Sequence, residues 1–191
     1  MSNSIMEWDE LNLLRASVSE MIREYRKTGN REHLMRWCDY MEYVLCLVYA
    51  YGWQDAEEIV GIVPFKDGLD DKAVNLDIKG ETFRERVAKQ LDERFDPTEE
   101  ILRIIDTEAH RDYNTGVYDA GKKSNTPNLK KRWNTRLDDK VRDAHAYLEG
   151  VTVGMDDEFY TYTGDSALYP GGFGVPDLDI NCRCTISLVK G

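Results

Sequence analysis

Residues 133–150 read WNTRLDDKVRDAHAYLEG, and residues 181–185 near the C-terminus read NCRCT. The first stretch is expected to be the end of a strand that leads into a short, strongly charged helix and stops at Gly150. The second stretch places one thiol on each side of Arg183, those of Cys182 and Cys184. We expect these two stretches to pack together and to organise the C-terminal half of the chain.

The composition describes an acidic protein of single-domain size. The chain has 191 residues, with 36 acidic and 25 basic side chains and a formal net charge of -11 at pH 7. A chain of this length buries well over half of its unfolded surface, so it can form a core without disulfides. The negative charge disfavours wrapping of nucleic acid over the whole surface, but it does not exclude a local basic patch.

Export and membrane insertion are not indicated. The first ten residues, MSNSIMEWDE, lack a basic region followed by an apolar one, so no signal peptide is expected. The longest apolar run, residues 44–51, is far shorter than the roughly 20 residues that span a bilayer. The four cysteines do not have the spacing of a secreted disulfide scaffold. We therefore expect a soluble protein of a reducing compartment.

Residues 1–60 are expected to form an N-terminal helical hairpin. Apolar side chains at helical spacing predict one helix over residues 7–27 and a second over about 31–51, with a short separate helix near 54–59. The second helix has more apolar surface than one partner helix can cover. That surplus should pack against the rest of the chain, which is the favoured interpretation, or against another protein.

A linker is expected at residues 61–80, followed by the main domain at 81–191. Thr82 and Glu85 have the capping-box pattern, and Asp96-Pro97 is expected to begin a helix that ends near Ala120, with Gly121 just after its end. The predicted fold class is α+β, an N-terminal helical hairpin plus a mixed domain of helices and a small antiparallel β-sheet. Its strands are expected at residues 129–135, 151–153, 158–162 and 182–189.

A row of polar side chains lies on one face of the helix expected to end near Ala120. Thr107, Arg111 and Asn114 recur at helical spacing, with Glu108 and His110 beside them. A solvent-exposed face is the simpler interpretation. The mixture of hydroxyl, guanidinium and amide groups instead predicts hydrogen bonds to a neighbouring irregular segment.

Four blocks of the sequence resemble one family in their order and spacing. They are GETFRERV (80–87), TEAHRDYN (107–114), KRWNTRLDDKVRDAHAYLEG (131–150) and NCRCT (181–185), and they resemble the phage Mu protein F-like family of minor head or head morphogenesis proteins. The resemblance spans roughly residues 75–188. It implies no established enzymatic activity and a structural role in assembling the head of a tailed double-stranded DNA phage or prophage.

The resemblance also implies partners and a location. The expected partners are the portal protein, the major capsid protein or a scaffold protein, with a second copy of the chain as a further possibility. The expected locations are the virion and, during assembly, the cytoplasm of the bacterial host. Action at or near the portal and packaging into the virion are part of the same expectation.

Cys182 and Cys184 are the main candidates for metal binding. In a strand, side chains two residues apart point to the same face, so both thiols could join His145 as ligands of a structural zinc ion. Asp138 is the candidate fourth ligand, with Asp139, His110 or water as alternatives. The alternative without metal is a pair of reduced, half-buried cysteines beside a locally hydrogen-bonded His145. Arg142 stands where many family members have a further cysteine or histidine, and it cannot bind a metal.

An architectural interpretation of residues 133–150 is the one we favour. Asp138 or Asp139 could cap the short helix, and Arg142 could bind a carboxylate or the carbonyls of the glycine-rich residues 163–179. Trp133 is expected to anchor the strand, and Gly150 to end the block. The block would then hold the glycine-rich segment and the cysteine strand against the row formed by Thr107, Arg111 and Asn114.

Two other functions remain as alternatives. A small zinc-dependent or thiol hydrolase could use His145 with Cys182 or Cys184 and orient the imidazole with Asn181, although no oxyanion-binding site is identifiable. An internal DNA-contacting protein could use residues 122–142, which carry eight basic and two acidic side chains. Pairing of these basic residues with the protein's own carboxylates is the simpler interpretation.

Overall fold

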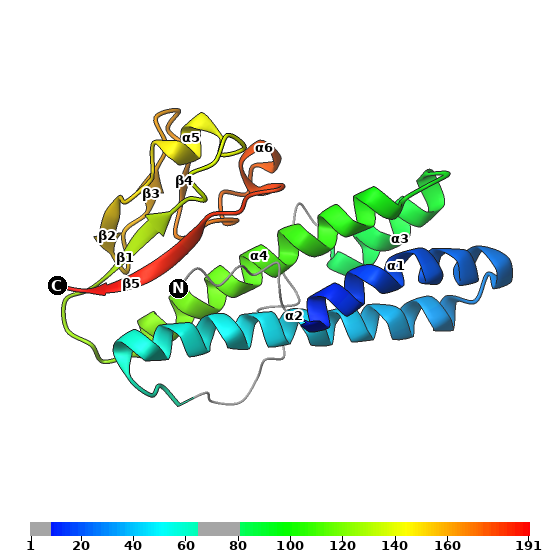
Figure 1. Ribbon diagram of the computed structural model, residues 1–191, viewed down its shortest axis with the longest axis horizontal. Helices are drawn as coiled ribbons and strands as arrows, with labels where there is room; N and C mark the ends of the chain where they lie inside the picture. Colours follow the sequence, from blue (N-terminus) through cyan, green and yellow to red (C-terminus); the bar gives the residue numbers. More distant parts are fainter. Residues whose placement is uncertain (1–8, 65–80) are drawn as a thin grey trace.

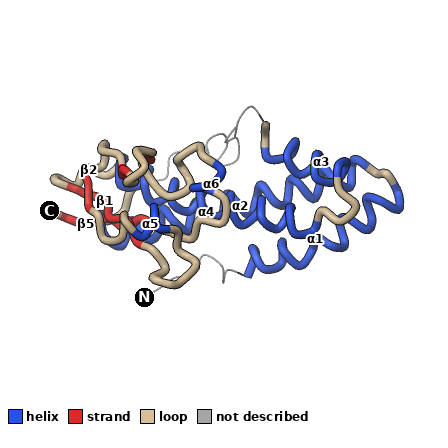
Figure 2. Tube along the Cα trace, turned by 90° about the horizontal axis from the view of Figure 1, so that it is seen from above, coloured by secondary structure: helices blue, strands red, loops and turns tan. Residues whose placement is uncertain are grey.

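The computed structural model describes residues 9–64 and 81–191. Four helices form the larger part of the protein: α1 (Asp9–Thr28), α2 (Arg31–Val60), α3 (Phe83–Glu93) and α4 (Thr98–Lys123). A smaller part, made of strands and loops, lies against one side of α4 (Figure 1). Seen from above, the strands gather at one end of the long helices (Figure 2).

The strands form two small antiparallel sheets. The larger sheet has the order β2-β1-β5, with β1 (Leu129–Asn134) between β2 (Thr152–Gly154) and β5 (Thr185–Lys190). The smaller sheet pairs β3 (Phe159–Tyr160) with β4 (Ser166–Ala167). Two four-residue helices, α5 (Asp143–Ala146) and α6 (Pro176–Asp179), lie in the connections. The predicted α+β class, with its N-terminal helical hairpin, is confirmed.

The second helix of the hairpin is longer than the sequence predicts, because Gly52 does not interrupt it. Gly52 lies where α2 crosses α4, and a Cβ atom there would be 2.1 Å from the carbonyl oxygen of Tyr113. Gly116 of α4 has the reciprocal position, since its Cβ would be 2.1 Å from the carbonyl oxygen of Tyr49. The two glycines therefore allow the helix backbones to touch. The prediction of a helix end near residue 51 and a separate helix at 54–59 was wrong.

Hydrogen bonds flank this crossing on both sides. The hydroxyl of Tyr113 donates to Asp55 at 2.6 Å, and the hydroxyl of Tyr49 donates to Asp119 at 2.9 Å. Each tyrosine therefore reaches across to a carboxylate of the other helix. The close approach of α2 and α4 is fixed by polar contacts as well as by apolar packing.

One buried apolar cluster joins both halves of the described chain. It extends from Leu11 in α1 through Val44 and Trp53 in α2 to Trp133 and Leu188 in the sheet. The surplus apolar surface of α2 is therefore mostly covered by the rest of the chain, as the favoured interpretation predicts. The boundary between an N-terminal hairpin (1–60), a linker (61–80) and a main domain (81–191) stays a prediction, and residues 65–80 lie outside the described residues.

Several local signals are confirmed and others are corrected. The capping box of Thr82 and Glu85 is present at the start of α3. α4 begins at Thr98, one residue later than Asp96-Pro97 predicts, and its N-cap is Pro97, although the carboxylate of Asp96 accepts a hydrogen bond from the backbone N–H of Thr98 at 3.1 Å. Gly121 does not end α4, because it lies inside the helix, where side-chain atoms of Leu188 leave little room for a Cβ. Within the described ranges, no helix has the length and hydropathy needed to cross a membrane.

Candidate functional site

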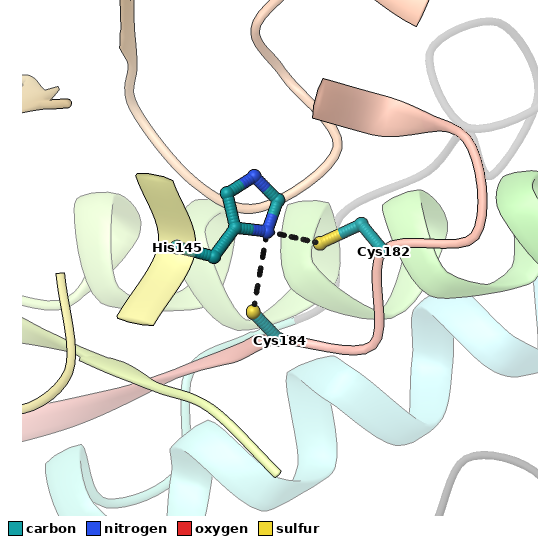
Figure 3. Close-up of side chains that lie close together, drawn as sticks. All are labelled: His145, Cys182 and Cys184. Carbon is teal, nitrogen blue, oxygen red and sulfur yellow. Dashed lines mark hydrogen bonds between the residues drawn. The ribbon is translucent and has the colours of Figure 1, made fainter. Parts of the chain in front are cut away.

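His145, Cys182 and Cys184 meet in a buried cluster between α5 and the segment that precedes β5 (Figure 3). The Nδ1 atom of His145 lies 3.6 Å from the Sγ atom of Cys182 and 3.6 Å from that of Cys184. The three residues are 1%, 4% and 3% exposed. The structure therefore brings together three of the four metal ligands that the sequence suggested.

The cysteines reach this position in a way that the sequence did not predict. β5 begins at Thr185, so Cys182 and Cys184 precede the strand, and strand alternation does not explain their common direction. Asn181 has a φ of 57°, in the left-handed region, and the backbone N–H of Cys182 donates to the backbone carbonyl oxygen of Asp179 at 3.1 Å. A turn of the chain, and not a regular strand, aims both thiols at His145.

α4 holds the backbone at this turn. The carbonyl oxygen of Cys184 accepts hydrogen bonds from Nε2 of His110 at 2.8 Å and from Nδ2 of Asn114 at 3.2 Å. Oδ1 of Asn114 accepts from the backbone N–H of Ile186 at 2.9 Å. Burial lowers the pKa of His110 to about 4, so its imidazole is neutral near pH 7. His110 therefore acts here as a hydrogen-bond donor and is not part of the thiol cluster.

Aromatic rings enclose His145 on two sides. Trp133 contacts the imidazole edge-on at 5.6 Å between ring centroids, and Phe173 stacks on it at 5.6 Å with an interplanar angle of 15°. Nε2 of His145 is buried and has no hydrogen-bond partner within residues 9–64 and 81–191. The pKa of Cys184 is lowered, first by a hydrogen bond from Cys182, whose own pKa is raised by the same bond.

Asp138 lies outside the cluster. Its two carboxylate oxygens accept hydrogen bonds from both Nη atoms of Arg183 at 2.6 Å each, and Oδ1 also accepts from the backbone of Lys140. The prediction that Asp138 or Asp139 caps the short helix was wrong, because the N-cap of α5 is Arg142 and no side chain caps it. Asp138 instead fixes the arginine that stands between the two cysteines in the sequence.

The polar row on α4 faces the irregular segment that the sequence indicated. Nε of Arg111 donates to the carbonyl oxygen of Gly171 at 2.8 Å, and Nη1 donates to Glu108 at 2.6 Å. Arg86 donates to the other oxygen of Glu108 at 2.8 Å. The side chains of Arg111 and Glu108 are only 6% and 4% exposed. Burial of this network makes each of its hydrogen bonds costly to remove.

The remaining residues of the expected clamp also contact their neighbours. The backbone N–H of Asn181 donates to Oγ1 of Thr107 at 3.5 Å, and the guanidinium of Arg142 donates to the carbonyl oxygen of Ile180. Gly150 has a φ of 72°, which favours glycine, and its N–H donates to the carbonyl oxygen of Trp133 at 2.9 Å. That these contacts stabilise the fold stays a prediction.

The sequence did not indicate that the ionisable residues Lys131 and Asp112 are buried. Lys131 is fully buried, donates from Nζ to the carbonyl oxygen of Met155 at 3.0 Å, and lies 4.8 Å from the ring centroid of Tyr118. Burial lowers its pKa to about 8. Asp112 is also fully buried, its pKa is raised by that burial, and its carboxylate has no hydrogen-bond partner within the described residues. Strand alternation with Leu129 and Trp133 could have indicated that Lys131 points inward.

Comparisons with known proteins match the part of the chain that contains this site. The family model described as phage Mu protein F like protein matches residues 72–187. The minor head protein GP7 of Bacillus phage SPP1 is 32% identical over 84 residues, which cover 44% of this chain and 27% of that protein. No solved structure matches.

A second relative carries the name of an enzyme. The NAD(+)--arginine ADP-ribosyltransferase EFV of Enterococcus faecalis (strain ATCC 700802 / V583) is 36% identical over 118 residues, which cover 59% of this chain and 24% of that protein. The matching segment thus spans about a quarter of each curated relative.

Proposed function

The chain belongs to the phage Mu protein F-like family, and from this membership we propose that it is a structural minor head protein of a tailed double-stranded DNA phage or prophage. It acts in head assembly at or near the portal and is packaged in the virion. The family match, which covers residues 72–187, is the observation that carries the proposal. The similarity to a minor head protein supports the same role.

The two relatives support a structural unit more than they support a shared reaction. One is named as a minor head protein and the other as an ADP-ribosyltransferase, yet each resembles this chain over only about a quarter of its own length. A segment shared by proteins with such different names is best explained as a common module, joined in each of them to other parts of a longer chain. We propose that the present chain uses this module without enzymatic activity.

The geometry of the thiol cluster also favours a structural role. The cavity that borders His145 and Cys184 has a volume of about 10 Å³, which is close to the space of one water molecule. A hydrolase would need room for a substrate beside its nucleophile. The hydrogen bonds from α4 to the surrounding backbone hold the cluster in a packed interior instead.

Contact with DNA through residues 122–142 is a weaker alternative. Lys131 is buried, and Lys122 forms an ion pair with Asp156. Part of the positive charge of this segment is therefore used within the protein. Binding to DNA through the remaining basic side chains would weaken steeply as salt is added.

The proposal is tested by following the protein through phage assembly. Procapsids and DNA-filled heads are purified from infected or induced cells, and the chain is measured in each by mass spectrometry. We expect the chain in both. In a pull-down, we expect purified portal, coat or scaffold protein to retain the chain, and the portal protein of an unrelated phage serves as the negative control. Absence of the chain from procapsids and virions would contradict the proposal.

Two further assays separate the alternatives. Purified chain is incubated with labelled NAD+ and an arginine-containing acceptor, with the Enterococcus relative as positive control, and we expect no transfer of label. Transfer of label would show that the chain is an ADP-ribosyltransferase and would contradict the proposal.

Binding of the purified chain to double-stranded DNA is measured over a range of salt concentrations, and tight, strongly salt-dependent binding would favour the DNA-contacting alternative.

A further inference from the structure

We propose that His145, Cys182 and Cys184 bind one zinc-class divalent metal ion that ties α5 to the start of β5. Two thiols and one imidazole are the ligand types that zinc prefers, and a site made of two cysteines and one histidine is known among zinc proteins. The three ligand residues are buried, and only their chemistry and distances support the metal site, so this inference does not depend on the proposed function.

The distances in the cluster fit a tetrahedral metal. With metal–sulfur bonds of about 2.3 Å and a metal–nitrogen bond of about 2.0–2.1 Å, tetrahedral angles place nitrogen and sulfur about 3.6 Å apart. Nδ1 of His145 lies 3.6 Å from both sulfur atoms. All three ligand atoms lie within 4.8 Å of one another, so the sulfur atoms need to approach by at most about 1 Å to reach the roughly 3.8 Å expected between two tetrahedral thiolate ligands.

Hydrogen bonding alone explains this arrangement poorly. Nδ1 of an imidazole offers either one N–H or one lone pair, and it can make one well-directed hydrogen bond. Two sulfur atoms at the same distance therefore compete for a single position on His145. A metal ion between the three atoms uses the lone pair of Nδ1 and one lone pair of each sulfur, so all three groups are satisfied together.

Charge and space fit the same ion. A divalent cation with two thiolates is neutral overall, so it can be buried without an unpaired charge. The cavity of about 10 Å³ beside His145 and Cys184 has room for about one water molecule as the fourth ligand. Arg142 and Arg183 line this cavity, so side chains that carry hydrogen-bond donors lie beside the position of this water.

The ion would join parts of the chain that are distant in sequence. His145 is separated from Cys182 by 37 residues and from Cys184 by 39. The intervening segment contains β2, β3, β4 and the glycine-rich residues 163–179, which have little regular structure to hold them. Closing such a long loop stabilises the folded state, and the free energy of metal binding adds directly to that of folding.

The first test uses the wild-type full chain and cobalt as a probe. Any zinc that the purified protein still carries is removed with a chelator, and Co²⁺ is then added to the folded protein. We expect one ion per chain and the absorption that arises from thiolate-to-cobalt charge transfer. A folded wild-type chain that shows no such absorption overturns the proposal, and so does binding without thiolate absorption, which would indicate surface carboxylates or His33.

Variants then assign the ligands. Cys182→Ser should lose the charge-transfer absorption and the bound zinc, whereas Cys38→Ser, an identical change at another buried cysteine, should keep both. Zinc at 100 times its dissociation constant should raise the melting temperature by about 5–10 °C in the wild type and in Cys38→Ser. Equal zinc binding and an equal shift in Cys182→Ser would overturn the proposal.

Discussion

Replacement of Gly116 by alanine should destabilise the protein, because the added methyl group would push α2 and α4 apart where they cross. The new Cβ would lie 2.1 Å from the carbonyl oxygen of Tyr49 and 3.0 Å from the backbone nitrogen of Trp53. Both contacts are to backbone atoms, so neither can be relieved by rotating a side chain. The two helices must therefore move apart, by about 1.3 Å if the oxygen contact is to reach the 3.4 Å of ordinary van der Waals distance.

The size of the effect follows from the packing that this movement loosens. Overpacking at a tight site costs about 1–3 kcal/mol, and a gap of 0.5–1 Å forfeits roughly a quarter to a half of each dispersion contact across the interface. Alanine gains about 1 kcal/mol over glycine through helix propensity. Subtracting this gain from the cost of overpacking leaves a net loss of up to about 2 kcal/mol in the free energy of unfolding, which corresponds to a fall of up to roughly 4–8 °C in melting temperature.

Gly121→Ala is the matched control, because it makes the same change in the same helix. There the nearest atoms are the ends of flexible side chains, with Cε of Met155 at 2.8 Å and Cδ2 of Leu188 at 3.0 Å. These can move, so we expect stability within about 1 kcal/mol of the wild type. Urea unfolding followed by circular dichroism measures both variants. If Gly116→Ala is no less stable than Gly121→Ala, the explanation by backbone contact is refuted.

Three further predictions concern the buried polar groups. Arg111→Ala should cost about 1–3 kcal/mol, because it removes the buried partner of Glu108 at 2.6 Å and of the Gly171 carbonyl, while Arg86 still pairs with Glu108. The more exposed pair lost in Arg103→Ala should cost less than about 1 kcal/mol, and thermal melts that do not separate the two variants would refute this. His110 has a pKa of about 4 in the folded chain and about 6.5 when unfolded, so the unfolded chain binds more protons between these values. Stability should therefore fall by up to about 3 kcal/mol as pH drops from 6.5 to 4, and urea titrations should show a smaller fall in His110→Gln. Lys131 has a pKa of about 8 when the chain is folded and 10.5 when it is unfolded, so the unfolded chain binds more protons between these values. The contribution of Lys131 to the free energy of unfolding should therefore rise from pH 8 to 10, by up to about 3 kcal/mol. A wild-type curve parallel to that of Lys131→Met over this range would contradict a buried, desolvated ammonium.

Signals that depend on near neighbours in the sequence predicted the fold well. The capping box of Thr82 and Glu85 requires only two residues three positions apart, and it is present. The apolar periodicity of the first helix and the alternation around Trp133 likewise gave α1 and β1 at nearly the observed residues. Each of these patterns reflects hydrogen bonds or burial that a single element largely determines by itself.

Features that depend on a distant partner could not be predicted in the same way. A glycine within a helical pattern can mark a break or a close contact, and only the position of Tyr113 shows that Gly52 makes a contact. Asp138 could be suggested as a metal ligand because it is acidic and near His145 in the sequence. Its observed partner, Arg183, is 45 residues away. The common direction of the two thiols also depends on the turn at Asn181, which no strand pattern encodes.

Three of the four blocks that carry the family resemblance meet around the thiol cluster. Residues 107–114 supply the side chains of Arg111 and Asn114, which bind the backbone of Gly171, Cys184 and Ile186. Residues 131–150 supply the imidazole that meets the two thiols of residues 181–185.

Each of these contacts joins a polar side chain to a buried partner. Replacing one of these side chains would leave its partner without a hydrogen bond, at a cost of about 1–3 kcal/mol in the free energy of unfolding. Replacing one buried apolar residue by another of similar volume usually costs less than about 1.5 kcal/mol. A packed interior of this kind therefore fixes residue identities as strictly as an active site does. A recognisable set of histidine, cysteine and arginine residues can thus belong to a structural head protein and need not indicate a catalysed reaction.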